Sequence, residues 1–118
     1  MFEFVYIFVM LFVSYKLYQR HKLISEIPRF VREGVLFVDV RTPAEFARRH
    51  HEKTINIPLN EIEQRINEFP MNTHIVLICS SGTRSMMAKK KLEKYGHKKT
   101  YNLGGWRNMK RALKNVDF

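Results

Sequence analysis

The sequence has few of the residues that build disulfide scaffolds, zinc clusters or flexible linkers. Its 118 residues include one cysteine, which excludes an internal disulfide and a cysteine-rich zinc finger. Five glycines and four prolines are too few for a low-complexity linker, and a hydrophobic content of 45% excludes a disordered tail. The length suits one domain of ordinary size. A single cysteine also fits a reducing compartment.

Glycine and proline are absent before Pro28, where the chain is instead strongly apolar. Seven of the fifteen aromatic residues lie within residues 1–18, and residues 4–13 form an unbroken apolar run. As a helix, residues 2–18 would be about 25 Å long, against a hydrocarbon core of about 30 Å. We therefore predict a single-pass transmembrane anchor with a basic flank over residues 1–22, followed by one domain over residues 23–118.

The charges beside the apolar run predict its orientation. Lys16, Arg20 and Lys22 lie near or beyond its end, whereas only Glu3 and the terminal amine lie near its start. Because basic residues concentrate on the cytoplasmic side of a membrane, we expect the N-terminus outside and the domain in the cytoplasm, at a bacterial inner membrane. A cleaved signal peptide, a buried core helix and a helix lying in the membrane plane are the alternatives.

Beyond the anchor, short apolar segments alternate with helical patterns. Alternation of this kind predicts an α/β domain whose parallel sheet is flanked by helices. The predicted strands are 23–25, 35–39, 55–58, 74–79 and 100–103. The predicted helices are 26–33 with Ser25 as N-cap, one starting at Thr42 with a capping box, 61–69, 84–95 and 106–114, with a turn at Gly104–Gly105.

The only cysteine stands at a position suited to chemistry. Cys79 ends the most apolar predicted strand and precedes Ser80, Ser81, Gly82, Thr83 and Arg84, which lead into a helix. Ligand sites of open α/β sheets lie at this edge, and Gly82 allows the loop amides to turn inward. A ring of N–H groups before a helix N-terminus stabilises an anion, so we predict a thiolate nucleophile with a lowered pKa. Arg84 would grip an anionic substrate. An inert core cysteine is the alternative.

Four motifs occur in the order and spacing of single-domain rhodaneses, and the chain resembles that family over about residues 23–113. They are Val38–Phe46, Ile55–Pro58, Cys79–Ser85 and Asn102–Gly105. The resemblance implies a rhodanese-like fold and a sulfurtransferase, in which Cys79 takes a sulfane sulfur from a donor such as thiosulfate and passes it, as a persulfide, to cyanide or a thiol. The amides of residues 80–84 would surround the persulfide, and Asp39 and Arg41 would brace the loop.

The resemblance implies no metal or organic cofactor. His50 and His51 are adjacent, but neighbours in sequence rarely share a metal ion without a third ligand, and we assign them no metal site. Trp106 is interpreted as a packing residue. The implied partners are a small anionic sulfur donor and a thiol or cyanide acceptor.

Two other functions compete with sulfur transfer. Cysteine-dependent phosphatases and arsenate reductases of related fold need a Cys-x5-Arg loop to enclose a tetrahedral oxyanion, whereas Cys79 to Arg84 is one residue shorter. A non-catalytic, membrane-localised binding module is the second alternative, although such a module has no need of the cysteine.

Most of the net charge of +10 lies in the C-terminal third. From Arg84 onward, eleven lysines and arginines face two acidic residues. Such a surface could contact anionic lipid or steer anionic donors toward the site. Nucleic acid is not expected, because few aromatic residues interleave with the lysines. A solvated helix face is the alternative.

Overall fold

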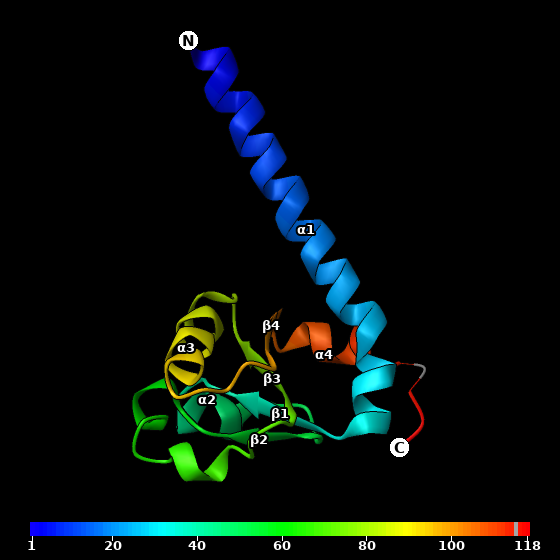
Figure 1. The fold of residues 1–118 in the computed structure, drawn as a ribbon, viewed down its shortest axis with the longest axis vertical. Helices are drawn as coiled ribbons and strands as arrows, with labels where there is room; N and C mark the ends of the chain where they lie inside the picture. Colours follow the sequence, from blue (N-terminus) through cyan, green and yellow to red (C-terminus); the bar gives the residue numbers. More distant parts are fainter. Residues whose placement is uncertain (115) are drawn as a thin grey trace.

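The computed structural model describes residues 1–114 and 116–118, and it places a parallel sheet between two layers of helices (Figure 1). The elements are α1 (Phe2–Glu33), β1 (Val35–Asp39), α2 (Pro43–Arg48), β2 (Thr54–Asn56), the 3₁₀ turns η1 (Leu59–Glu61) and η2 (Ile66–Glu68), β3 (His74–Cys79), α3 (Thr83–Lys94), β4 (Thr100–Gly105) and α4 (Arg107–Ala112).

The predicted parallel sheet is confirmed, with four strands in the order β2-β1-β3-β4. Every residue of β3 is buried, as a strand covered on both faces requires, and β3 pairs with β1 on one side and β4 on the other. Because all strands are parallel, their carboxyl ends share one edge of the sheet. Cys79, the last residue of β3, lies on that edge.

Two hydrophobic clusters pack on opposite faces of the sheet. One cluster combines Leu23, Ile27 and Phe30 of α1 with residues of α4 and inward-facing strand residues. The other combines Ala88 and Leu92 of α3 with the segment that contains η1 and η2. The sheet is therefore covered on both faces, by α1 and α4 on one side and by α3 on the other (Figure 1).

The prediction of a strand at 23–25 and a separate helix at 26–33 is wrong, because α1 is one continuous helix of 32 residues. The Ser25 hydroxyl donates to the carbonyl of Lys22 within this helix, so Ser25 is no N-cap. Pro28 lies in the helix interior and removes one backbone hydrogen bond, a cost offset by burial of Ile27 and Phe30. The predicted stop is right: α1 ends at Glu33, and Gly34 has a φ of 107°.

The exposed part of α1 is long and apolar enough to cross a membrane. None of residues 1–22 is buried, whereas Leu23, Ile27 and Phe30 are. The ring of Phe30 stacks on His74 of β3 at 4.0 Å between centroids, and Nε2 of His74 lies 2.6 Å from Glu33 Oε2. These contacts fix the C-terminal third of α1 to the sheet.

Two further predictions are wrong in detail. Residues 61–69 form no α-helix but the turns η1 and η2, although Ile62 and Phe69 are buried as their spacing predicted. Gly104 and Gly105 belong to β4 rather than to a turn. The capping box that starts α2 is confirmed: the Thr42 hydroxyl accepts from the Glu45 amide, and the Glu45 carboxylate accepts from the Thr42 amide.

Candidate active site

The side chain of Cys79 lies at the centre of the loop that joins β3 to α3. The Gly82 amide donates to the Cys79 sulfur at 2.8 Å, and the Ser85 hydroxyl lies 3.4 Å from it. Cys79 is fully buried. Among the described residues Cys79 is the only cysteine, and it is free. Of the loop amides that were predicted to turn inward, those of Gly82 and Ser81 bond to this sulfur.

Two opposing effects act on the pKa of Cys79. Burial is the larger single effect and raises the pKa, because a thiolate is poorly solvated in the interior. Hydrogen bonds from the Ser85 hydroxyl and from the amides of Ser85, Gly82 and Ser81 together outweigh burial. The pKa of Cys79 therefore lies below its ordinary value, which favours the nucleophilic thiolate.

Two glycines make this loop geometry possible. Gly82 adopts a φ of 99°, which turns its amide toward the sulfur and starts α3. A Cβ at Gly105 would lie 2.8 Å from the carbonyl oxygen of Ser80, a separation that real Cβ atoms do not show. The next amide, that of Trp106, donates to the carbonyl of Cys79 at 2.7 Å. The end of β4 thus packs directly against the loop.

A neutral hydrogen-bond network behind the sulfur was missed by the sequence analysis. The Ser85 hydroxyl lies 2.6 Å from Oδ1 of Asn102, which is a second acceptor for its single proton besides the Cys79 sulfur, and Nδ2 of Asn102 donates to the Gly82 carbonyl at 3.0 Å. Oδ1 of Asn102 also accepts from the Gly104 amide at 2.9 Å. Asn102 thereby joins β4 to the loop around Cys79. The available signal was the motif Asn102–Gly105, to which no role in the site had been assigned.

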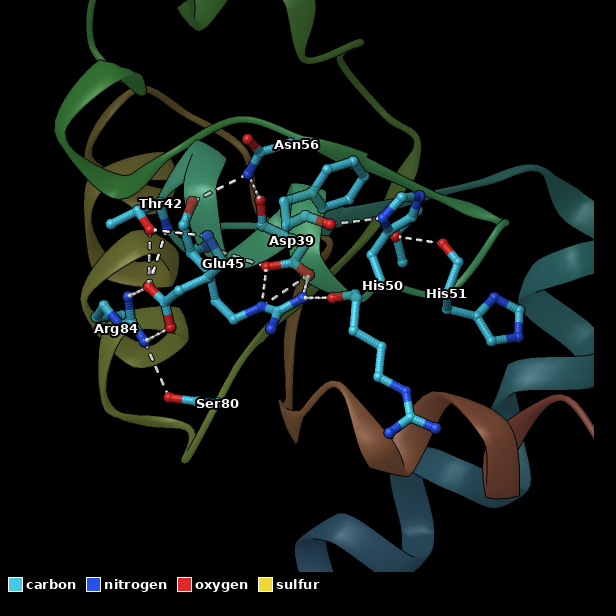
Figure 2. Close-up of polar contacts among 12 residues, drawn as sticks. Asp39, Thr42, Glu45, His50, His51, Asn56, Ser80 and Arg84 are labelled. Atoms are coloured by element: carbon cyan, nitrogen blue, oxygen red, sulfur yellow. Dashed lines mark hydrogen bonds and ion pairs between the residues drawn. The ribbon is translucent and has the colours of Figure 1, made fainter.

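Arg84 lies at the rim of the loop, where a carboxylate already faces its guanidinium. Both of its terminal nitrogens bind the carboxylate of Glu45, at 2.6 and 3.0 Å, and Nη2 also donates to the Ser80 hydroxyl at 2.9 Å (Figure 2). The hydrogen bond from Arg84 is the main reason that the pKa of Glu45 falls to about 2. A substrate anion would therefore have to compete with the Glu45 carboxylate for this guanidinium. Glu45, which the sequence analysis considered only as a capping residue, is its partner.

Asp39 and Arg41 form the predicted ion pair. Nε and Nη2 of Arg41 donate to the Asp39 carboxylate at 2.8–3.0 Å, and both side chains are buried. Nη2 also donates to the Arg49 carbonyl, and the Asn56 amide binds the carbonyls of Asp39 and Arg41 (Figure 2). The pair therefore fixes the turn between β1 and α2. The guanidinium of Arg41 also lies over the ring of Trp106, with 5.5 Å between its central carbon and the ring centroid. Trp106 follows β4 directly and donates its amide to Cys79, so it lies between the ion pair and the loop.

The remaining predicted residues line the outside of the loop. Ser80, Ser81 and Thr83 are exposed. His50 and His51 act locally. Nδ1 of His50 lies 2.6 Å from the Phe46 carbonyl (Figure 2). Nδ1 of His51 accepts from the Lys53 amide. Within residues 1–114 and 116–118, no group of three or more histidine, cysteine and acidic side chains is placed to hold a metal ion.

Comparison with known proteins finds one family model and several relatives that match most of the domain that follows the apolar segment. Residues 25–112 match the model of the Rhodanese-like domain. Thiosulfate sulfurtransferase PspE of Escherichia coli is 33% identical over 89 residues, which cover 74% of this chain and 84% of PspE. YrkF of Bacillus subtilis is 41% identical over 71 residues, 60% of this chain but only 38% of YrkF.

A solved structure of a rhodanese with anions from E. coli superimposes with a TM-score of 0.60 at 32% identity, and the match covers 64% of this chain and 91% of that one. The residues that match the family model include the strand that ends at Cys79 and the loop that follows. On this basis, the chain belongs to the rhodanese-like family.

Proposed function

We propose that this protein is a membrane-tethered sulfurtransferase that carries a sulfane sulfur on Cys79. The observation that carries the proposal is the sulfur of Cys79, held by the Gly82 amide and the Ser85 hydroxyl with its pKa lowered. The similar proteins named as sulfurtransferases support the reaction class. Thiosulfate is the donor we propose, with cyanide or a thiol as acceptor.

The reaction proceeds in two displacements. In the first, the Cys79 thiolate attacks the outer sulfur of thiosulfate, the S–S bond of thiosulfate breaks, and sulfite leaves with the bonding pair. In the second, cyanide attacks the terminal sulfur of the Cys79 persulfide, and thiocyanate forms as the thiolate returns. Donor and acceptor supply all the electrons, so the two half-reactions balance without a further reductant or oxidant.

The loop stabilises both anionic states of the cycle. The amides of Ser81, Gly82 and Ser85 hydrogen-bond to the sulfur, and the start of α3 adds the positive end of a helix dipole. Because the chain has one cysteine, no second thiol of the same chain can resolve the persulfide, and the sulfur must pass to an external acceptor. Asp39 and Arg41 support this site from the scaffold.

We further propose residues 1–22 as a single-pass anchor and residues 23–118 as the catalytic domain. Exposure of the apolar residues before Leu23 supports this division. The basic residues after the apolar run support an external N-terminus and a cytoplasmic domain at a bacterial inner membrane, with anionic lipid beside the C-terminal lysines.

The test uses the full chain in detergent micelles, with thiosulfate and cyanide as substrates and thiocyanate as the measured product. We expect turnover by the native chain and none by Cys79→Ala, with folding of the variant checked by circular dichroism. Mass spectrometry after thiosulfate alone should find a sulfur adduct on Cys79 that dithiothreitol removes. Equal turnover by Cys79→Ala would overturn the proposal. No adduct with any donor, together with a captured protein partner, would indicate a non-catalytic binding module.

A further inference from the structure

The direction of α1 brings the anchor to the catalytic edge of the sheet. α1 runs antiparallel to the strands, because Phe30 near its end stacks on His74 at the start of β3, while Arg20 lies beside Gly104 near the end of β4. Arg20 lies thirteen residues before Glu33, about 20 Å along the helix, while a five-residue strand spans about 17 Å. Arg20 is therefore level with the carboxyl ends of the strands, in agreement with its position beside Gly104. Figure 1 shows the N-terminal part of α1 extending away from the sheet.

The guanidinium of Arg20 packs against the loop that holds Cys79. A Cβ at Gly104 would lie 2.7 Å from Nη2 of Arg20, and a Cβ at Gly82 would lie 3.8 Å from it. Gly82 is the residue whose amide binds the Cys79 sulfur. A side chain of the anchor helix thus reaches the outer wall of the candidate active site.

This guanidinium has no partner among the residues that the structure describes. Arg20 is partly buried, yet no described hydrogen bond or ion pair involves its side chain. Arg84, in contrast, is already paired with the Glu45 carboxylate and also donates to the Ser80 hydroxyl. A partly buried arginine with five unused N–H donors is suited to bind an oxyanion with planar, bidentate geometry.

Arg20 opens onto a cleft of about 690 Å³ between α1 and α3. The active-site loop forms part of its wall through Ser81, Gly82 and Thr83. Its charged lining comprises Lys16, Arg20, Lys22, Lys89 and Lys90, with Glu26 and Glu93. The cations outnumber the carboxylates, and Glu26 already faces Arg29 at 3.8 Å. The cleft therefore attracts anions to one side of the loop.

We propose that Arg20 is the anion-recognition residue for the sulfur donor, so that the anchor helix forms part of the donor-binding site. This inference rests on the proposed sulfurtransferase function and adds the substrate class: a small sulfur-bearing oxyanion such as thiosulfate. The role predicted for Arg84 passes to Arg20, because Arg84 is neutralised and Arg20 is not. Contacts of Leu23, Ile27 and Phe30 with the sheet hold α1 in register for this role.

Two alkylating reagents that differ by one charge test this inference without sulfur transfer. In the full chain, reconstituted in bilayer nanodiscs of zwitterionic lipid, Cys79 is alkylated by neutral iodoacetamide or by anionic iodoacetate and followed by mass spectrometry. Only one thiol is present, so the signal is unambiguous. We expect Arg20→Gln to lower the iodoacetate rate about threefold to tenfold and leave the iodoacetamide rate unchanged. The KM for thiosulfate should rise by a similar factor with kcat retained.

Matched variants separate recognition from structure. Arg20→Lys keeps the charge and should retain most of the iodoacetate rate. Arg32→Gln removes an exposed charge near the C-terminal end of α1, away from the cleft, and should change neither alkylation rate. High salt should reduce the difference between native chain and Arg20→Gln.

Three outcomes would overturn the inference. Equal loss of both alkylation rates in Arg20→Gln would assign Arg20 a structural role. An unchanged iodoacetate rate would show that Arg20 does not attract anions to Cys79. An effect that appears only in nanodiscs with phosphatidylglycerol would mean that a lipid headgroup occupies the cleft. Failure of the proposed function itself is distinguishable, because it would leave Cys79 without a persulfide while the ratio of alkylation rates still responds to Arg20.

Discussion

Two arginine–carboxylate pairs lie beside the candidate site, and they differ chiefly in burial. Asp39 and Arg41 are two residues apart, with side chains 0% and 5% exposed. Glu45 and Arg84 are 39 residues apart in sequence, with side chains 34% and 31% exposed. Both pairs are bidentate, so their hydrogen-bond geometry does not distinguish them.

The difference indicates that burial decides what such a pair does. The charges of Asp39 and Arg41 have no water to solvate them, so each depends on the other and the pair acts as part of the scaffold. Glu45 and Arg84 retain contact with solvent, so their pair holds the rim of the loop at little net gain in stability. The side chains nearest to the sulfur are neutral: the Ser85 hydroxyl contacts it, and Asn102 holds Ser85 in place.

Removing one member of the buried pair should have the largest effect on stability. Asp39→Ala leaves the Arg41 guanidinium buried without a counter-ion, and we expect the free energy of unfolding to fall by about 3–5 kcal/mol. Urea unfolding of the full chain in micelles measures this, with the fluorescence of Trp106, the only tryptophan, as the signal. Asp117→Ala, at an exposed residue, is the control. A loss below about 1 kcal/mol would show that burial is not what separates the two pairs.

Removing the neutral contact to the sulfur should affect reactivity rather than the fold. In Ser85→Ala the thiolate loses the hydroxyl that favours it, so the pKa of Cys79 rises and alkylation by iodoacetamide at neutral pH slows about tenfold. The pH dependence of the alkylation rate measures both changes. Thr83→Ala, which removes an exposed hydroxyl from the same loop, should leave the midpoint of the pH–rate curve, and thus the pKa of Cys79, unchanged. An unchanged midpoint in Ser85→Ala would assign the lowered pKa to the amides alone.

Breaking the exposed pair should have the smallest effect, and one that depends on pH. Glu45→Gln should cost about 1 kcal/mol or less at neutral pH. The pKa of Glu45 is about 2 in the folded protein against an ordinary 4.5, so the contribution is complete above about pH 4.5 and is lost as the pH falls toward 2. The difference in Tm between native chain and variant should therefore shrink over that range. A difference that stays constant from pH 6 to pH 2.5 would contradict this.

Local signals in the sequence were sufficient for much of the fold. The apolar run of residues 74–79 predicted β3 with its bounds, and Thr42 to Glu45 predicted the capping box of α2. The loop after Cys79 was predicted because a glycine and a helix start follow the strand directly. In each case the interacting residues lie within a few positions of one another, so the local sequence pattern is enough to predict the local structure.

The errors concern interactions between distant segments or competition between similar local structures. The helix predicted at 61–69 had the right buried residues, but packing against α3 and the sheet favours two 3₁₀ turns over the helix. A break before Glu26 was predicted from Ser25 and Pro28, whereas the helix extends through both because burial of Ile27 and Phe30 offsets the hydrogen bond lost at Pro28. Contacts such as Glu45–Arg84 and Ser85–Asn102 join separate elements, and no local pattern specifies them.

The unbroken course of α1 from the apolar segment into the core has a consequence for how the protein meets its substrates. A helix without an interruption provides no joint between the bilayer and the sheet, and its last turns are fixed by Phe30 and Glu33. With the proposed anchor in place, Cys79 would be held at a nearly constant height above the lipid, facing it. A donor or acceptor that associates with the same leaflet would then find the sulfur by lateral diffusion, a search in two dimensions in place of three.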